Sequence, residues 1–311
     1  MNYPIFFDSK NSINLFGLAE NFNFLSQLYL KKKFPNVLML TGDKGVGKST
    51  LINHFLFSIF DSDNYDKKKN KLIGSSNFLN QFKNGIFENI IYINGSDFKS
   101  VKVEDIRNLK TRIFQTTILK KSRFVILNGI ELFNQNSLNS LLKIIEEPTN
   151  NNFFLLINNK SRPLLDTIKS RTLEIKIILK ENQRLEIINN LVRTFDIKLT
   201  LDPIMSKISP GNFIKFNYLC NEYKISPNSE FINNLSVLLS LYKKHNNASF
   251  INLAFFITEY FFKDLCKNSK NKKDQIYENK NYIVNNLNNF LLYNINQTSL
   301  LNAISNKLNN E

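Results

Sequence analysis

The segment TGDKGVGKST, residues 41–50, constrains the fold of this chain more than any other feature. It has the spacing G-x-x-x-x-G-K-[ST] of a phosphate-binding loop. An apolar run at 37–40 precedes it, and apolar residues at helical spacing follow it over 50–60. This order of strand, loop and helix is the context that the motif requires. It therefore predicts a nucleotide-binding fold in which a buried strand leads into the loop.

The chemistry expected of the loop follows from its residue types. Glycines allow backbone N–H groups to turn around phosphate oxygens, and the N-terminus of the next helix favours an anion. Lys48 would reach the β- and γ-phosphates, and Ser49 would hold magnesium. A glycine-rich turn with a chance lysine is the alternative. The predicted ligand is ATP or ADP with Mg²⁺, and the predicted binding residues are Gly42, Gly45, Gly47, Lys48, Ser49 and Thr50.

Short apolar runs alternate with helical patterns through the first half of the chain, which predicts a parallel sheet covered on both faces. The pattern predicts strands at 37–40, 90–93, 124–127, 153–157 and 172–177, and helices at 50–60, 103–114 and 138–146, the last ended by Pro148. A polar insertion at 61–70 is predicted to be a surface loop.

Only helical periodicity follows residue 180. The predicted helices are 181–194, 202–208, 212–222, 230–242, 250–266, 274–293 and 299–308, with a break at 226–228. The sequence thus predicts an α/β domain at 1–179, a small helical domain at 180–225 and a second helical domain at 226–311.

Composition excludes some classes of protein. No apolar run approaches the length of a membrane span, and the N-terminus lacks the features of a signal peptide. Cys220 and Cys266 are the only cysteines, so they cannot form a four-ligand zinc site or a disulfide scaffold. We therefore expect a cytoplasmic protein with no zinc and no membrane partner. The net charge of +15 is compatible with nucleic-acid binding, but equally with a lysine-rich solvated surface.

The strand at 124–127 ends in Asn128-Gly129, where a nucleotide-hydrolysing P-loop protein would place an aspartate for magnesium. Asn128 offers an oxygen without charge, so its hold on a hard cation is weaker. Gly129 offers no side chain. Glu131 lies further along and is not expected to substitute without a bulge. The sequence predicts a site that binds nucleotide without hydrolysing it; compensation by another acid is the competing interpretation.

Residues 134–148, NQNSLNSLLKIIEEP, resemble the N-x-x-A-x-N-A-L-L-K-x-L-E-E-P signature of bacterial clamp-loader subunits, which belong to the AAA+ group. Residues 164–172, LLDTIKSRT, resemble the L-L-x-T-I-x-S-R-C motif of that family, with Thr172 in place of its cysteine. The resemblance extends from about residue 15 to about residue 211. It implies an AAA+ P-loop domain followed by a helical lid and a C-terminal helical collar.

Within the family, the chain is most similar to the delta-prime subunits of DNA polymerase III. No cysteine lies between the loop and the second strand, which argues against a gamma/tau subunit, although delta-prime subunits can also carry a zinc module there. Delta subunits usually lack a recognisable P-loop. The neutral Asn128 also fits delta-prime, because those subunits often do not hydrolyse ATP themselves.

The resemblance implies roles for particular residues. Arg171 would act in trans as an arginine finger on ATP held by a neighbouring subunit; a surface arginine in a salt bridge is the alternative. Asn158 or Asn159 would be sensor 1, or merely part of a polar turn. The sensor-2 arginine expected soon after a glycine is missing, because Asn212 follows Gly211.

The function implied is that of a delta-prime-like subunit. It would help an ATP-driven complex load the sliding clamp on primed DNA during replication, with gamma/tau and delta subunits as partners and weak or absent hydrolysis of its own. The alternative is an autonomous or homo-oligomeric AAA+ ATPase acting on DNA, including a gamma/tau-like motor subunit. A P-loop kinase or GTPase is disfavoured by the helical domains and by Ser170-Arg171.

Overall fold

The computed structural model describes residues 3–95, 101–115, 121–147, 151–227, 230–268 and 273–309. The chain divides into two compact units. One unit comprises Asn2–Asn190 together with Ser209–Gly211, and the other comprises Leu191–Ile208 together with Asn212–Glu311. The boundaries of the predicted three-domain division differ from these, and that division stays a prediction.

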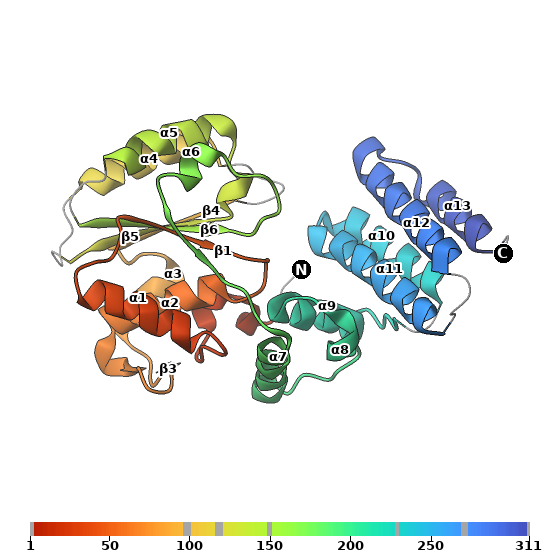
Figure 1. Ribbon diagram of the computed structural model, residues 1–311, viewed down its shortest axis with the longest axis horizontal. Coiled ribbons are helices and arrows are strands. Elements are labelled where there is room, and N and C mark those ends of the chain that lie inside the picture. The colour runs from red at the N-terminus through yellow and green to blue at the C-terminus, as the bar shows by residue number, and fades with distance from the viewer. Residues whose placement is uncertain are drawn as a thin grey trace. The chain divides into compact units, whose positions relative to one another are not determined.

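A five-stranded parallel sheet forms the centre of the first unit (Figure 1). Its strands lie in the order β4 (Ile90–Asn94), β5 (Arg123–Asn128), β6 (Asn152–Asn158), β1 (Val37–Thr41) and β7 (Leu173–Lys176). The five strands predicted from the sequence are confirmed, and so is the α/β fold class. Because β5, β6 and β1 are parallel neighbours, their carboxyl ends meet at one edge of the sheet.

Helices cover both faces of the sheet, as the parallel topology requires (Figure 1). One face carries α1 (Ala19–Leu30), α2 (Lys48–Phe60) and α3 (Asn77–Asn84). The other carries α4 (Val103–Phe114), α5 (Gln135–Glu146) and α6 (Asp166–Lys169). Helices α1 and α3 are not among the helices predicted from the sequence. Pro148, predicted to end α5, lies outside the described residues.

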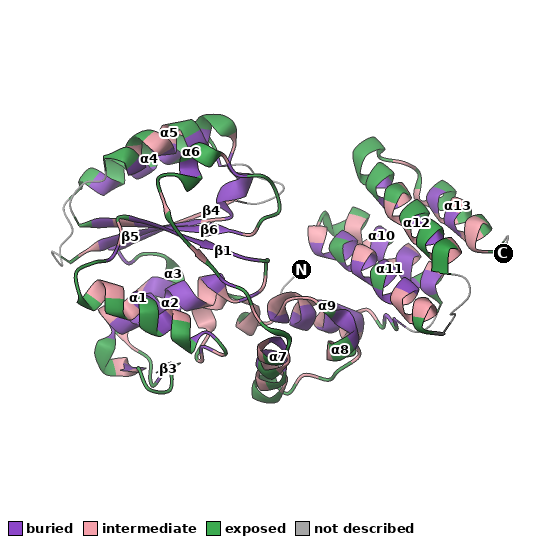
Figure 2. Cartoon of the chain, viewed as in Figure 1, coloured by how far each residue is buried: buried purple, intermediate pink, exposed green. Residues whose placement is uncertain are grey.

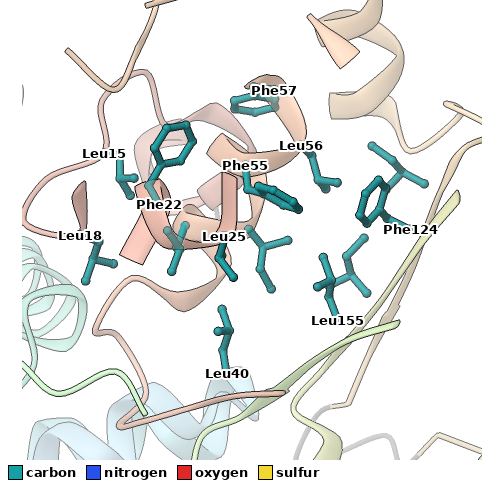
Figure 3. Close-up of a cluster of buried hydrophobic side chains, with 14 of the residues drawn as sticks. Leu15, Leu18, Phe22, Leu25, Leu40, Phe55, Leu56, Phe57, Phe124 and Leu155 are labelled. Carbon is teal, nitrogen blue, oxygen red and sulfur yellow. The ribbon is translucent and has the colours of Figure 1, made fainter. Parts of the chain in front are cut away.

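Alternation along each strand divides the core into two apolar clusters, one on each face. Leu38 and Leu40 of β1 belong to one cluster, and Val37 and Met39 to the other. Successive side chains of a strand point to opposite faces, which explains this division. All four are buried, and Figure 2 shows β1, β5 and β6 buried along most of their length. Figure 3 shows the first cluster, in which Leu40 faces aromatic and leucine side chains of α1 and α2.

The insertion predicted as a surface loop folds partly into a hairpin. Strand β2 (Tyr65–Asp66) pairs antiparallel with β3 (Lys71–Leu72), after a 3₁₀ turn, η3, at Ser62–Asn64. Tyr65 is buried, and its hydroxyl lies 3.0 Å from Nδ1 of His54 on α2. The burial of Tyr65 anchors a segment whose polar composition gave no strand signal. Two further 3₁₀ turns, η1 (Ile5–Phe7) and η2 (Ser9–Asn11), lie near the N-terminus.

The C-terminal half is helical, as predicted. Helix α7 (Glu181–Phe195) follows the sheet, and the later helices are α8 (Pro203–Ser206), α9 (Pro210–Glu222), α10 (Phe231–His245), α11 (Ala248–Asn268), α12 (Lys273–Tyr293) and α13 (Gln297–Asn309). In the second unit, α10 and α12 each pack against both α11 and α13. Among the described residues, every helix is too short or too polar to cross a membrane.

Candidate nucleotide site

The predicted phosphate-binding loop connects the end of β1 to the first turn of α2. Gly47 has a φ of 103°, a left-handed conformation that glycine adopts without steric cost. Gly42 is required for a different reason: a Cβ there would lie 2.5 Å from the carbonyl oxygen of Ile177. Ser49 and Thr50 lie half-buried in the first turn of α2. The loop therefore has the backbone path and the helix N-terminus that phosphate binding requires.

Lys48 is buried within its own loop, with 3% of its surface exposed. Its Nζ atom donates hydrogen bonds to the carbonyl oxygens of Gly42, at 2.7 Å, and Asp43, at 2.8 Å. Burial lowers the pKa of Lys48 to about 8, and the negative charge of Glu131 opposes this shift more than that of Asp43. An anion bound in the loop would replace carbonyl dipoles as the partner of this ammonium group.

Residues Ser209–Gly211 contact the loop although they lie far from it in the sequence. The Ser209 hydroxyl donates to the carbonyl oxygen of Lys44 at 2.5 Å, and the Gly211 N–H donates to that of Gly45 at 2.8 Å. A Cβ on Gly211 would lie 2.9 Å from the Gly45 oxygen. The sequence-based interpretation of this segment concerns only its missing arginine. Its contact with the loop left no signal in the sequence beyond the glycine itself.

Asn128, at the end of β5, is paired with another amide. Its Nδ2 atom donates to Oδ1 of Asn94, its register partner on β4, at 3.1 Å. Its carbonyl oxygen accepts from the N–H of Gly95 at 2.8 Å. The strand end that would carry a magnesium-binding aspartate thus holds a neutral amide pair.

Glu131 is the acid that the chain places near this edge. A 3₁₀ turn, η4 (Ile130–Leu132), follows Gly129, whose φ is 68°. Glu131 is 5% exposed, and its Oε1 atom accepts a hydrogen bond from the Ser161 hydroxyl at 2.8 Å. Its Oε2 atom is buried without a hydrogen-bond partner among the described residues.

The two sensor-1 candidates have different surroundings. Asn158, the last residue of β6, is buried, and its Oδ1 atom accepts from the N–H of Lys160 at 2.9 Å. Asn159 is half-buried, and its Nδ2 atom is 3.9 Å from where a Cβ of Gly129 would lie. The Asn158 amide therefore stabilises its own turn, whereas the Asn159 amide lies beside the end of β5.

Arg171 lies just after α6, with 38% of its side chain exposed. Its Nη2 atom lies 2.8 Å from Oε1 of Glu146, and its Nη1 atom donates to the carbonyl oxygen of Thr167 at 3.0 Å. These partners belong to α5 and α6, not to the phosphate-binding loop. The salt bridge that the sequence analysis names as the alternative role of Arg171 is therefore present within this chain.

Neither cysteine chemistry nor metal chemistry provides a further site among the residues that the structure describes. Cys220 is buried, which raises the pKa of its thiol to about 12, and Cys266 is half-buried. Neither thiol is in a disulfide. In the part of the chain that the structure describes, no group of three or more His, Cys, Asp or Glu side chains could hold a metal ion.

Residues 17–181 match the family described as "DNA polymerase III, delta subunit", which is more than half of the 311 residues. The chain belongs to this family. The matched part contains the phosphate-binding loop, Asn128, both sensor-1 candidates and Arg171, and it ends at the first residue of α7.

This delta-family chain is also similar to curated subunits of DNA polymerase III. It is 28% identical to DNA polymerase III subunit delta' of Buchnera aphidicola subsp. Baizongia pistaciae over 157 residues, which are 50% of this chain and 45% of the relative. It is 38% identical to subunit delta' of Pseudomonas aeruginosa over 76 residues, 24% of this chain and 23% of the relative. These matches confirm the predicted delta-prime-like character, although each covers less than half of the relative's length.

Among solved structures, this member of the delta family is similar to a DNA polymerase III gamma subunit-related protein of Thermotoga maritima. The identity is 15%, the TM-score is 0.46, and 92% of this chain and 98% of the other are covered.

Proposed function

We propose that this chain is the delta-prime-like, non-motor subunit of a DNA polymerase III clamp loader, acting in the cytoplasm during DNA replication. Its partners would be subunits of the gamma/tau and delta types, the sliding clamp indirectly, and primed DNA. The observation that carries this proposal is an intact phosphate-binding loop beside a strand end, Asn128-Gly129, without a carboxylate. Binding without efficient hydrolysis is what such a combination favours.

The residues present fit a nucleotide with Mg²⁺. Backbone N–H groups of the loop would bind the phosphates, Lys48 would neutralise their charge, and Ser49 would contribute an oxygen to the cation. The orphaned oxygen of Glu131 supports this fit, because a buried carboxylate oxygen without a partner is costly unless a cation or donor joins it. Bound Mg²⁺ would supply charge neutralisation of the phosphates.

Arg171 is proposed as the finger offered to a neighbouring subunit's ATP. Its partial exposure supports this role, because the guanidinium can reach an external anion without leaving a buried site. A guanidinium at a phosphoryl group offsets the charge that develops during transfer. Of the sensor-1 candidates, Asn159 fits better, because the Asn158 Oδ1 atom already accepts the Lys160 N–H.

The test is ATP hydrolysis by the purified chain alone, with Mg²⁺ and primed DNA, against Lys48→Ala. No turnover above that variant is expected. Arg171→Ala would then be assayed in the complex with gamma/tau- and delta-type subunits. This variant should lower the rate of ATP hydrolysis at the neighbouring subunit's site by about 10³-fold or more. Lys169→Ala, two residues earlier at the end of α6, is the matched control.

One observation favours a second function, an autonomous AAA+ ATPase. Glu131 is a buried acid close to the loop, and it could compensate for Asn128. Clear turnover by the chain alone that Lys48→Ala abolishes would make this second function the better account.

A further inference from the structure

The Glu131 carboxylate is buried, yet only one of its two oxygen atoms has a hydrogen-bond partner in the described part of the chain. A buried carboxylate is costly unless it is paired with a cation or fully hydrogen-bonded. Most acidic side chains avoid this cost by lying at the surface. The position of Glu131 therefore calls for a partner that the chain does not itself supply.

The backbone after β5 brings Glu131 to this place. An extended continuation of the strand would carry residue 131 away from the edge of the sheet. Instead, the left-handed Gly129 bends the chain, and η4 folds it into a tight turn. Ser161, three residues beyond β6, then holds the Oε1 atom. The turn takes the place of the bulge without which Glu131 is not expected to substitute, and it returns an acid to the edge that Asn128 occupies.

The loop lysine lies within electrostatic reach of this carboxylate. Strand β6 lies between β5 and β1, and the N–H of Gly42 donates to the carbonyl oxygen of Asn158 at 3.1 Å. The Glu131 charge influences Lys48 more than that of Asp43 in the loop. The Lys48 ammonium group nevertheless donates its hydrogen bonds to loop carbonyl oxygens. Among the described residues, Lys48 and Glu131 do not form an ion pair. Glu131 and Lys48 therefore interact through their charges, with no direct ion pair between these two described side chains.

We propose that Glu131 is the acidic residue of this nucleotide site, and that its Oε2 atom takes part in holding the Mg²⁺ of bound ATP or ADP, directly or through one water. Mg²⁺ is bound in proteins through one or two carboxylates together with phosphate oxygens and water. Glu131 would supply the negative charge that Asn128 lacks. This role concerns binding, because Gly129 places no second carboxylate beside the reacting phosphate. It does not depend on which complex the chain joins.

The experiment is binding of a fluorescent ADP analogue to the full chain, with Mg²⁺ and with EDTA in its place. For the unaltered chain, we expect binding to be tighter with Mg²⁺. The Mg²⁺-dependent gain is the factor by which Mg²⁺ increases the affinity for the ADP analogue. Glu131→Gln should reduce this gain by about tenfold, the size of effect seen when groups around a protein-bound metal are removed. Glu186→Gln, an exposed acid on α7, is the control and should leave the gain unchanged.

A rescue variant separates charge from structure. Asn128→Asp combined with Glu131→Gln places a carboxylate at the strand end, and it should restore the Mg²⁺-dependent gain. If Glu131→Gln fails to fold, Ser161→Ala serves instead, because it removes the bond that orients the carboxylate; it should weaken the same gain. An unchanged Mg²⁺ dependence in either variant would overturn the proposal. A lack of nucleotide binding by the unaltered chain would also overturn it. The proposed role of Arg171 would be unaffected by that result, because it is tested separately by hydrolysis in the complex.

Discussion

Arg171 and Glu146 form an ion pair of 2.8 Å that joins the residues after α6 to the last turn of α5. Both side chains are partly exposed, at 38% and 45%. Pairs of this kind contribute about 1 kcal/mol or less to stability, because solvent screens them. Glu146 therefore holds Arg171 in place without binding it strongly, so the finger role proposed for Arg171 requires only that a nucleotide phosphate displace an exposed carboxylate.

Glu146→Gln should consequently change the free energy of unfolding by less than about 1 kcal/mol. In the assembled complex, ATP hydrolysis should stay the same or rise, because Arg171 no longer has a competing carboxylate. Urea unfolding and steady-state hydrolysis measure the two effects. A loss of hydrolysis as large as that of Arg171→Ala would contradict this and would mean that Glu146 positions the guanidinium.

Lys48 should make stability depend on pH in alkaline solution. Its pKa in the folded chain, about 8, lies below the ordinary value of 10.5 because of burial. Between these values the unfolded chain binds more protons, so the free energy of unfolding should rise with pH. The rise from pH 8 to pH 10 should be about 2 kcal/mol.

Comparison with Lys48→Met isolates this effect, because the other groups that titrate in the same range are common to both chains. The variant should lack the rise when urea unfolding is measured at both pH values without nucleotide. Equal changes in the two chains would show that the buried ammonium does not determine this pH dependence.

His54 should produce the corresponding effect in acid. It is fully buried on α2, and burial lowers its pKa from 6.5 to about 4. The unfolded chain binds the proton first as the pH falls, so stability should be lost between pH 6.5 and pH 4. From pH 7 to pH 4.5 the loss should be about 2 kcal/mol.

His54→Asn should remove most of this acid sensitivity, because an amide can accept from the Tyr65 hydroxyl but does not titrate. Urea unfolding at the two pH values provides the measurement, and His245→Asn, at an exposed site, serves as control. The prediction fails if His54→Asn loses as much stability in acid as the unaltered chain.

Gly211→Ala should disturb the phosphate-binding loop from outside. The added Cβ would lie 2.9 Å from the Gly45 oxygen and 3.0 Å from its Cα, both backbone atoms that cannot move independently of the loop. The free energy of unfolding should fall by about 1–3 kcal/mol, as it does at other overpacked sites. Faster hydrogen exchange at loop amides 42–47 would report it. Gly74→Ala, whose nearest neighbour is 3.7 Å away, should change neither quantity.

Local patterns predicted the parts of the fold that depend on local rules. Runs of apolar residues marked β4, β5, β6 and β1, and the three central strands are buried because both faces of a parallel sheet are covered. The edge strand β7 is mostly exposed and mixes apolar with charged residues. The hairpin at Tyr65 was missed because its two strands have only two residues each, too short for any periodicity. Helix α1 was missed although its buried side chains, Phe22 and Leu25, have helical spacing.

The sequence by itself determined that this chain has a phosphate-binding loop, a strand end without an acid, and an arginine in a family motif, because each is a matter of residue type at fixed spacing. Only the tertiary structure decided which distant groups meet there. Gly211 reaches the loop across more than 160 residues of chain, and Glu131 returns to the sheet edge through a left-handed glycine and a 3₁₀ turn. Such meetings depend on backbone direction and on the order of the strands, which no local pattern of residues encodes.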